Sequence, residues 1–162
     1  MKKEDSFKVR SVKDCFRKNL IPNKGRIITK RRKPSEHEMK TAKLLLAKFG
    51  GTINFLAGKG EMGLKTPDAN WSGRLLEIKR AKGKSSADSQ TRKALEQIKG
   101  NGVILLDISE NIKSVIQIKQ EITHRIKRET SHKNKKDLNL NIIIIKNRRI
   151  IDILEITKKV EA

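Results

Sequence analysis

The sequence predicts a single α+β domain in which helices flank a mixed central β-sheet. Hydrophobic residues recur at helical and at strand spacing along residues 35–157, in the order α-β-β-β-α-β-α-β-β. A continuously apolar segment at residues 103–108 is typical of a central strand covered on both faces. Short turns at Ser72-Gly73 and Asn147-Arg148 favour two β-hairpins. A chain of 162 residues with 35% hydrophobic residues fits one compact domain.

A capping box at Ser35 and Glu38 marks the start of the first helix, because each side chain can satisfy a free backbone N–H of the other residue. Apolar residues follow at helical spacing, namely Met39, Ala42, Leu45, Leu46 and Phe49. The Gly50-Gly51 pair ends this helix, and residues 52–56 form a short strand. Residues 64–68 and 74–80 then form the first hairpin.

The rest of the chain contains two further helices, a strand at residues 103–108 and a second hairpin. The second helix covers residues 86–99 and buries a stripe made of Ala87, Thr91, Ala94, Leu95 and Ile98. The third helix covers residues 111–128 and turns inward Val115, Ile118, Ile122 and Ile126. Residues 140–146 and 149–154 form the terminal hairpin.

Residues 1–34 are expected to form a basic, partly flexible arm outside the core. They contain 13 Lys or Arg residues against 3 acidic residues and show little apolar periodicity beyond Phe7, Val9, Val12 and Phe16. One short helix is expected near residues 11–19. The run at residues 30–33 either contacts phosphates or is a solvated linker. The expected organisation is therefore an arm at residues 1–34, the α+β domain at residues 35–157 and a tail at residues 158–162.

The charge of the chain indicates its partner. Lys+Arg 39 against Asp+Glu 18 gives a net charge of +21, which attracts polyanions, so nucleic acid is the leading candidate. The lone Cys15 excludes an internal disulfide and fits a reducing compartment. The N-terminus lacks the apolar region of a secretory signal, and no run approaches the roughly 20 apolar residues of a membrane span. We therefore expect a cytoplasmic place of action and no membrane partner.

The first hairpin contains the candidate catalytic residues. If Ser72-Gly73 is a two-residue turn, residues whose numbers sum to 145 face each other, so Asp68 lies opposite Glu77 with Cβ atoms about 5 Å apart. Strand alternation places Lys79 on the same face as Glu77. Like charges opposite each other destabilise a sheet, unless a cation, a metal or a proton resolves the conflict.

Asp68, Glu77 and Lys79 match the pattern P-D…E-x-K. In such a site two carboxylates hold a divalent cation, and the lysine steers the attacking water or polarises the scissile phosphate. The alternative interpretation is a surface hairpin whose acids pair with Lys65, Lys79 and Arg80.

A phosphate-binding pocket is expected at the start of the second helix, where free N–H groups and the helix dipole favour an anion. Lys82, Ser85 and Ser86 would line it, with Arg92 about two turns further along. The compatible alternative is plain N-capping, in which Ser85 pairs with Asp88 in a second capping box.

RNA cleavage without a metal would use the 2′-OH of the RNA as nucleophile, and needs a base, an acid and a cation near the phosphorane. Glu77 or Asp68 would be the base, and Lys79, Lys82 or Arg92 would stabilise the charge. His37 would be the acid if the start of the first helix lies near the sheet; otherwise it is simply exposed.

The ordered motifs of residues 35–108 resemble the C-terminal tRNA-nuclease toxin domains of contact-dependent growth inhibition proteins. They are the capping-box helix, Lys-Thr-Pro-Asp, Leu-Glu-Ile-Lys-Arg-Ala-Lys-Gly, Ser-Ser, an Arg-bearing helix and Val-Ile-Leu-Leu-Asp-Ile. The resemblance implies a tRNA endoribonuclease of barnase/EndoU/colicin/RelE-like fold that needs no metal, with an acidic immunity protein as partner. The site residues it implies are Asp68, Glu77, Lys79, Lys82, Ser86 and Arg92. Arg80 departs from the family pattern, which has Ser or Thr after the strand lysine.

Two other functions remain open from the sequence. The α-β-β-β-α-β order and the P-D…E-x-K string also resemble the metal-dependent PD-(D/E)xK nuclease core of restriction endonucleases. That resemblance implies Mg²⁺ or Mn²⁺ bound by Asp68 and Glu77. The third alternative is a basic protein that binds nucleic acid without cleaving it.

Overall fold

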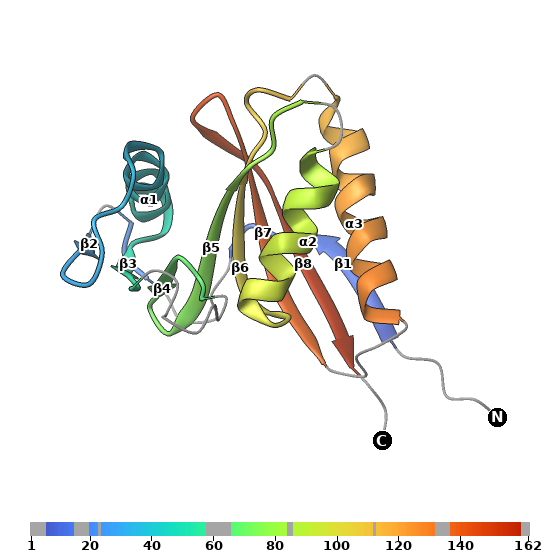
Figure 1. The fold of residues 1–162 in the computed structure, drawn as a ribbon, viewed down its shortest axis with the longest axis horizontal. Helices are drawn as coiled ribbons and strands as arrows, with labels where there is room; N and C mark the ends of the chain where they lie inside the picture. Colours follow the sequence, from blue (N-terminus) through green and yellow to red (C-terminus); the bar gives the residue numbers. More distant parts are fainter. Residues whose placement is uncertain are drawn as a thin grey trace.

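The computed structural model describes residues 6–14, 20–22, 24–57, 66–83, 86–111, 113–131 and 137–159. Within these residues, eight strands form one mixed sheet in the order β1-β8-β7-β6-β5-β4-β3-β2 (Figure 1). The elements are β1 (Ser6–Ser11), β2 (Gly25–Ile28), α1 (Glu36–Phe49), β3 (Gly51–Phe55), β4 (Ala69–Trp71), β5 (Arg74–Arg80), α2 (Ser86–Ile98), β6 (Asn101–Asp107), α3 (Val115–Ser131), β7 (Leu138–Lys146) and β8 (Arg149–Lys159).

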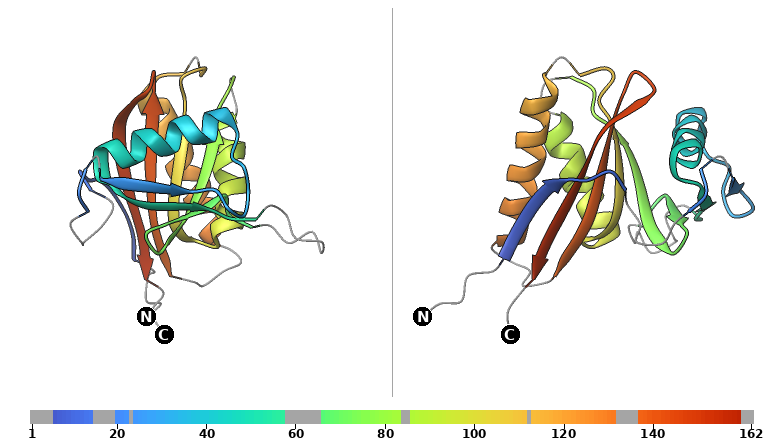
Figure 2. Two further views of the ribbon diagram at one scale, coloured as in Figure 1. Left: turned by 90° about the vertical axis from the view of Figure 1, so that its left-hand side faces the viewer. Right: turned by 180° about the vertical axis from the view of Figure 1, so that it is seen from behind.

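The helices lie on opposite faces of the sheet. Helix α1 runs across the strands on one face, and α2 and α3 pack on the other (Figures 1 and 2). A hydrophobic cluster lies on each face of the sheet, and strand β6 contributes side chains to both. Leu105 packs on the α1 face, whereas Ile104 and Leu106 pack on the face of α2 and α3. This two-sided burial explains the uninterrupted apolar run and confirms the predicted central strand.

The element order from α1 to β8 agrees with the sequence prediction. The capping box is present, since Ser35 Oγ accepts a hydrogen bond from the N–H of Glu38 at 3.1 Å and the Glu38 carboxylate accepts one from the N–H of Ser35 at 3.0 Å. Strands β5, β6 and β7 are parallel, whereas the β4–β5 and β7–β8 hairpins are antiparallel, which makes the sheet mixed.

The prediction that the order begins with a helix is wrong, because two strands precede α1. Strand β1 pairs antiparallel with β8, and β2 pairs parallel with β3, so residues 6–11 and 25–28 belong to the sheet rather than to an external arm. Both are edge strands, each of which buries few apolar side chains, such as Phe7 and Ile27, and their hydrophobic pattern is correspondingly weak.

The two ends of the chain differ from the prediction in further ways. Of the expected helix near residues 11–19, Ser11 ends β1 and residues 15–19 lie outside the described residues. Strand β8 continues to Lys159, into the expected tail. The domain boundaries at residues 34 and 157 stay a prediction. None of the helices in the described ranges is long and apolar enough to cross a membrane.

Candidate active site

The β4–β5 hairpin has the predicted register. Trp71 pairs with Arg74 and Ala69 with Leu76, so the paired residue numbers sum to 145. Ser72 and Gly73 have φ values of 48° and 96°, as a two-residue hairpin turn requires. The first strand begins later than predicted: β4 covers Ala69–Trp71, whereas residues 66–68 of the expected strand precede it and residues 64–65 lie outside the described residues.

The structure brings Asp68, Glu77 and Lys79 together. The Asp68 carboxylate accepts a hydrogen bond from the backbone N–H of Ile78 at 2.8 Å, which holds it beside Glu77. Lys79 Nζ lies 3.7 Å from Glu77 Oε1. Glu77 and Lys79 pair with Ile104 and Leu106 in the parallel β5–β6 ladder, so both side chains lie on the face of the sheet that α2 and α3 cover.

Glu77 is the most unusual side chain of this group, because it is only 1% exposed. Burial raises the pKa of its carboxyl to about 9, the hydrogen bond and the charge of Asp68 add to this, and Lys79 opposes it. Glu77 therefore carries a proton at neutral pH in the metal-free protein. Its Oε2 atom is buried and has no hydrogen-bond partner among the residues that the structure describes.

Arg32 and Glu38 extend this cluster toward α1. The Arg32 guanidinium donates two hydrogen bonds to the Glu38 carboxylate, at 3.0 and 2.8 Å, and further bonds to the carbonyls of Leu56 and Asp68. It also lies 3.9 Å from Asp68 Oδ1. Burial opposes ionisation of Glu38, but hydrogen bonds from Arg32 and Ser35 bring its pKa below the ordinary value. The hydrogen bond with Glu38 raises the pKa of the Arg32 guanidinium in turn.

Sequence reasoning did not assign Arg32 and Glu38 to the site. Arg32 stands in a run of four basic residues, which gives no reason to single out one of them. Glu38 is explained by the capping box alone. Only the folded chain shows that the two side chains meet beside Asp68.

The donor set suits a small divalent cation. Two carboxylates converge, and one of them has a buried oxygen without a partner in the described part of the chain. A cation would resolve the conflict that a proton now resolves. No group of three or more Asp, Glu, His or Cys side chains that could hold a metal ion occurs in the part of the chain that the structure describes. Mg²⁺ commonly binds through only one or two carboxylates and keeps several waters.

His37 lies on the other side of the sheet from Lys79. Its Nε2 atom is 2.9 Å from Asp107 Oδ2. Asp107 pairs with Arg80, and Arg80 lies on the same face of β5 as Ile78, two residues earlier, which packs on the α1 face. Burial opposes the ionisation of Asp107, but hydrogen bonds from Ser109 and His37 lower its pKa. His37 is thus engaged with Asp107, and no interaction joins it to Glu77 in the described residues.

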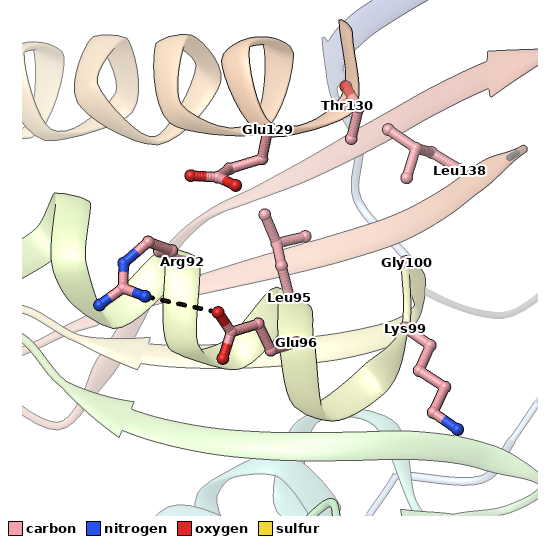
Figure 3. Close-up of a pocket in the computed structure, with 8 residues that line it drawn as sticks. All are labelled: Arg92, Leu95, Glu96, Lys99, Gly100, Glu129, Thr130 and Leu138. Carbon is pink, nitrogen blue, oxygen red and sulfur yellow. Dashed lines mark hydrogen bonds and ion pairs between the residues drawn. The ribbon is translucent and has the colours of Figure 1, made fainter. Parts of the chain in front are cut away.

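The residues expected to bind phosphate do not gather around the carboxylates. Lys82 is exposed and lies 3.4 Å from Glu110. Arg92 lies on the side of α2 that faces α3, where it pairs with Glu96 at 3.4 Å in a pocket also lined by Glu129 and Thr130 (Figure 3). These two basic residues make no interaction with Asp68 or Glu77 within the described ranges.

The two serines of the expected phosphate pocket are Ser85 and Ser86. Ser86 is the first residue of α2, and Ser85 lies outside the described residues. Asp88, the expected capping partner of Ser85, accepts a hydrogen bond from Arg125 of α3 at 2.7 Å. The roles of these residues toward a phosphate stay predictions.

Fold and side chains together define a basic α+β domain with a carboxylate–lysine cluster on its β4–β5 hairpin. No protein-family model matches the chain, and no curated protein matches it either. Its structure is similar to the CdiA-CT/CdiI toxin and immunity complex from Burkholderia pseudomallei, with a TM-score of 0.45 and 15% sequence identity. The match covers 79% of this chain and 98% of that chain.

Proposed function

We propose that the protein is a nuclease that cleaves phosphodiester bonds with the help of a divalent cation held by Asp68 and Glu77. The observation that carries the proposal is that Glu77 lies beside both Asp68 and Lys79 in a chain of net charge +21. A cluster of this composition combines affinity for a cation with a cationic group for a phosphate, and the chain as a whole attracts a polyanion.

Each protein group has a distinct task in this proposal. Bound Mg²⁺ or Mn²⁺ would supply Lewis acidity and an activated water. Asp68 is held in place by the N–H of Ile78, and Glu77 offers an oxygen that has no hydrogen-bond partner within the described ranges. Lys79 is 18% exposed, so its ammonium can reach the scissile phosphate, and its charge favours the ionised form of Glu77.

The ordered sequence motifs support a proposal for the substrate and the biological role. These motifs resemble tRNA-cleaving toxin domains, so we propose tRNA as the substrate, a toxin-like role in the cytoplasm and an acidic immunity protein as inhibitor. The positive charge of the chain supports both polyanionic partners.

A second candidate mechanism is metal-free cleavage of RNA. Because the pKa of Glu77 is raised to about 9, its carboxyl can donate a proton at neutral pH, while Asp68 accepts one from the 2′-OH and Lys79 stabilises the phosphorane. The protonated carboxyl of Glu77 beside Asp68 favours this alternative. His37 takes no part in it, since it binds Asp107.

Cleavage of purified tRNA in excess EDTA, and again with added Mg²⁺ or Mn²⁺, tests these mechanisms. Cleavage that requires the cation supports the metal-dependent nuclease, and cleavage in EDTA supports the metal-free mechanism. Absence of cleavage in every condition, with retained RNA binding, would identify a non-catalytic binding protein. The matched control is Glu77→Gln, which keeps the shape of the side chain but can neither ionise nor donate a carboxylic proton.

A further inference from the structure

The turn between β7 and β8 places two arginines at the end of the sheet where β5 ends. Asn147 and Arg148 form this turn, with φ values of 51° and 61°. Two-residue turns of this kind favour Asn-Gly, because both central residues need positive φ. Arg148 occupies the position that glycine fills most easily, so the fold tolerates a conformational strain to keep an arginine there.

The charges of this turn are free. Arg148 and Arg149 are exposed, and in the described ranges neither of them makes an ion pair. Arg80 and Lys82 lie at the same end of the sheet but share Glu110 as a partner, at 3.4 Å each. The turn therefore offers positive charge that no ion pair among the described residues compensates.

Hydrogen bonds hold the turn in a defined position. The N–H of Asn147 donates to Ser109 Oγ at 2.9 Å, Ser109 donates to Asp107, and Asp107 binds His37 at 2.9 Å. A β-bulge between Ile144 and Ile145 also bends the hairpin near its tip. The arginines are thus presented by a fixed turn rather than by a loose loop.

The turn is close enough to Lys79 for one nucleic-acid strand to reach both. Lys79 pairs with Leu106, and Leu106 pairs with Ile144, so Lys79 and Ile144 are two strands apart, about 10 Å. Arg148 follows Ile144 by four residues, at most about 13 Å further along the hairpin. Figure 1 shows the β7–β8 turn and the segment from β5 to α2 at the same end of the sheet. A strand bound at Lys79 would need only a few nucleotides to arrive at Arg148.

We propose that Arg148 and Arg149 bind phosphates of the nucleic-acid strand that is cleaved at the Asp68–Glu77–Lys79 cluster. This inference rests on the proposed nuclease function. Arginines in such positions fix the register of a strand through its backbone without reading its bases, so the contact contributes affinity and salt dependence but not sequence preference.

The decisive comparison is Arg148→Gly against Lys99→Gly. Lys99 is also exposed, basic and at positive φ (52°), but it follows α2 at the opposite end of the sheet, next to the start of β6. Glycine suits both backbones, so each variant removes one charge and relieves the same strain. Binding of end-labelled tRNA is measured by fluorescence anisotropy at several salt concentrations, in EDTA and in the Glu77→Gln background to prevent cleavage.

Arg148→Gly should weaken binding and reduce the slope of log K against log salt by about 0.7 to 0.9, the value for one lost phosphate contact. Lys99→Gly should leave that slope unchanged. Equal losses of tRNA binding in the two variants would show a general charge effect and overturn the inference. Unchanged tRNA binding by Arg148→Gly would also overturn it, and would leave the turn to another anionic partner such as an acidic protein. If the parent protein binds no nucleic acid at any salt concentration, the proposed function fails together with the inference.

Discussion

The backbone N–H of Ile78 donates a 2.8 Å hydrogen bond to the side chain of Asp68, immediately beyond the last backbone pair of the β4–β5 hairpin. A carboxylate here takes the place of a backbone carbonyl in the ladder. The residue before Ile78 is Glu77, so this bond fixes two acidic side chains next to each other. Glu77 is buried and its carboxyl is neutralised by a proton, which leaves the cluster ready to exchange that proton for a cation.

We expect Glu77→Gln to abolish cleavage without destabilising the fold at neutral pH. The native carboxyl is protonated there, because its pKa is raised to about 9, and an amide reproduces its shape and neutrality. Single-turnover cleavage assays test the loss of activity, and thermal unfolding of the same preparation tests the unchanged stability. A fall of the Tm by more than a few degrees would mean that the ionised form supports the fold, contrary to this interpretation.

The stability of the metal-free protein should fall as the pH rises from about 5 to about 9. Between the ordinary pKa of 4.5 and the native value of about 9, the folded state keeps a proton that the unfolded chain releases, so ionisation favours unfolding. Urea unfolding in EDTA across this range measures the slope. Glu77→Gln should flatten it, whereas an equal slope in the variant would assign the effect to other groups.

Mn²⁺ or Mg²⁺ should raise the Tm more at about pH 8.5 than at about pH 6. A cation at Asp68 and Glu77 displaces the proton of Glu77, and proton release becomes easier as the pH approaches the pKa of about 9. Thermal shift measurements with and without the metal give the increase in Tm at each of the two pH values. Asp68→Asn and Glu77→Gln serve as controls, and a shift that survives in both variants would place the cation elsewhere.

Lys79→Ala should abolish cleavage while changing the Tm by only a few degrees. Its ammonium lies 3.7 Å from a carboxyl that is neutral at pH 7, so the ion pair contributes little to the metal-free fold. Removal of the charge should also raise the pKa of Glu77 further. Cleavage rates and thermal unfolding test this, and a large loss of stability would make Lys79 a structural residue.

Arg32→Ala should destabilise the fold by about 2–4 kcal/mol, because it leaves the half-buried Glu38 carboxylate and two carbonyls without their donor. Urea denaturation gives the free energy of unfolding. The neighbouring Arg31 is exposed and has no ion pair among the described residues, so Arg31→Ala is the matched control and should be nearly neutral. Equal effects would show that Arg32 acts only through its charge.

The central elements were predictable because their patterns are strong. Helix α1 has a capping box and a regular apolar stripe, and β6 is apolar without interruption because both of its faces are covered. Strands β1 and β2 were missed because edge strands of a basic segment need little apolar periodicity. The backbone hydrogen bonds with β8 and β3 that place them in the sheet depend on partners far away in the sequence.

The sequence alone determined which residues of the β4–β5 hairpin oppose each other, because a two-residue turn and strand alternation are local rules that set the positions of Asp68, Glu77 and Lys79. Only the tertiary structure decided how deeply Glu77 is buried, that Arg32 and Glu38 join it, and that His37 and Arg92 turn to other partners. Burial and long-range pairing arise when helices and distant strands pack against the hairpin. Local periodicity does not specify these contacts, because the partners are far apart in the sequence.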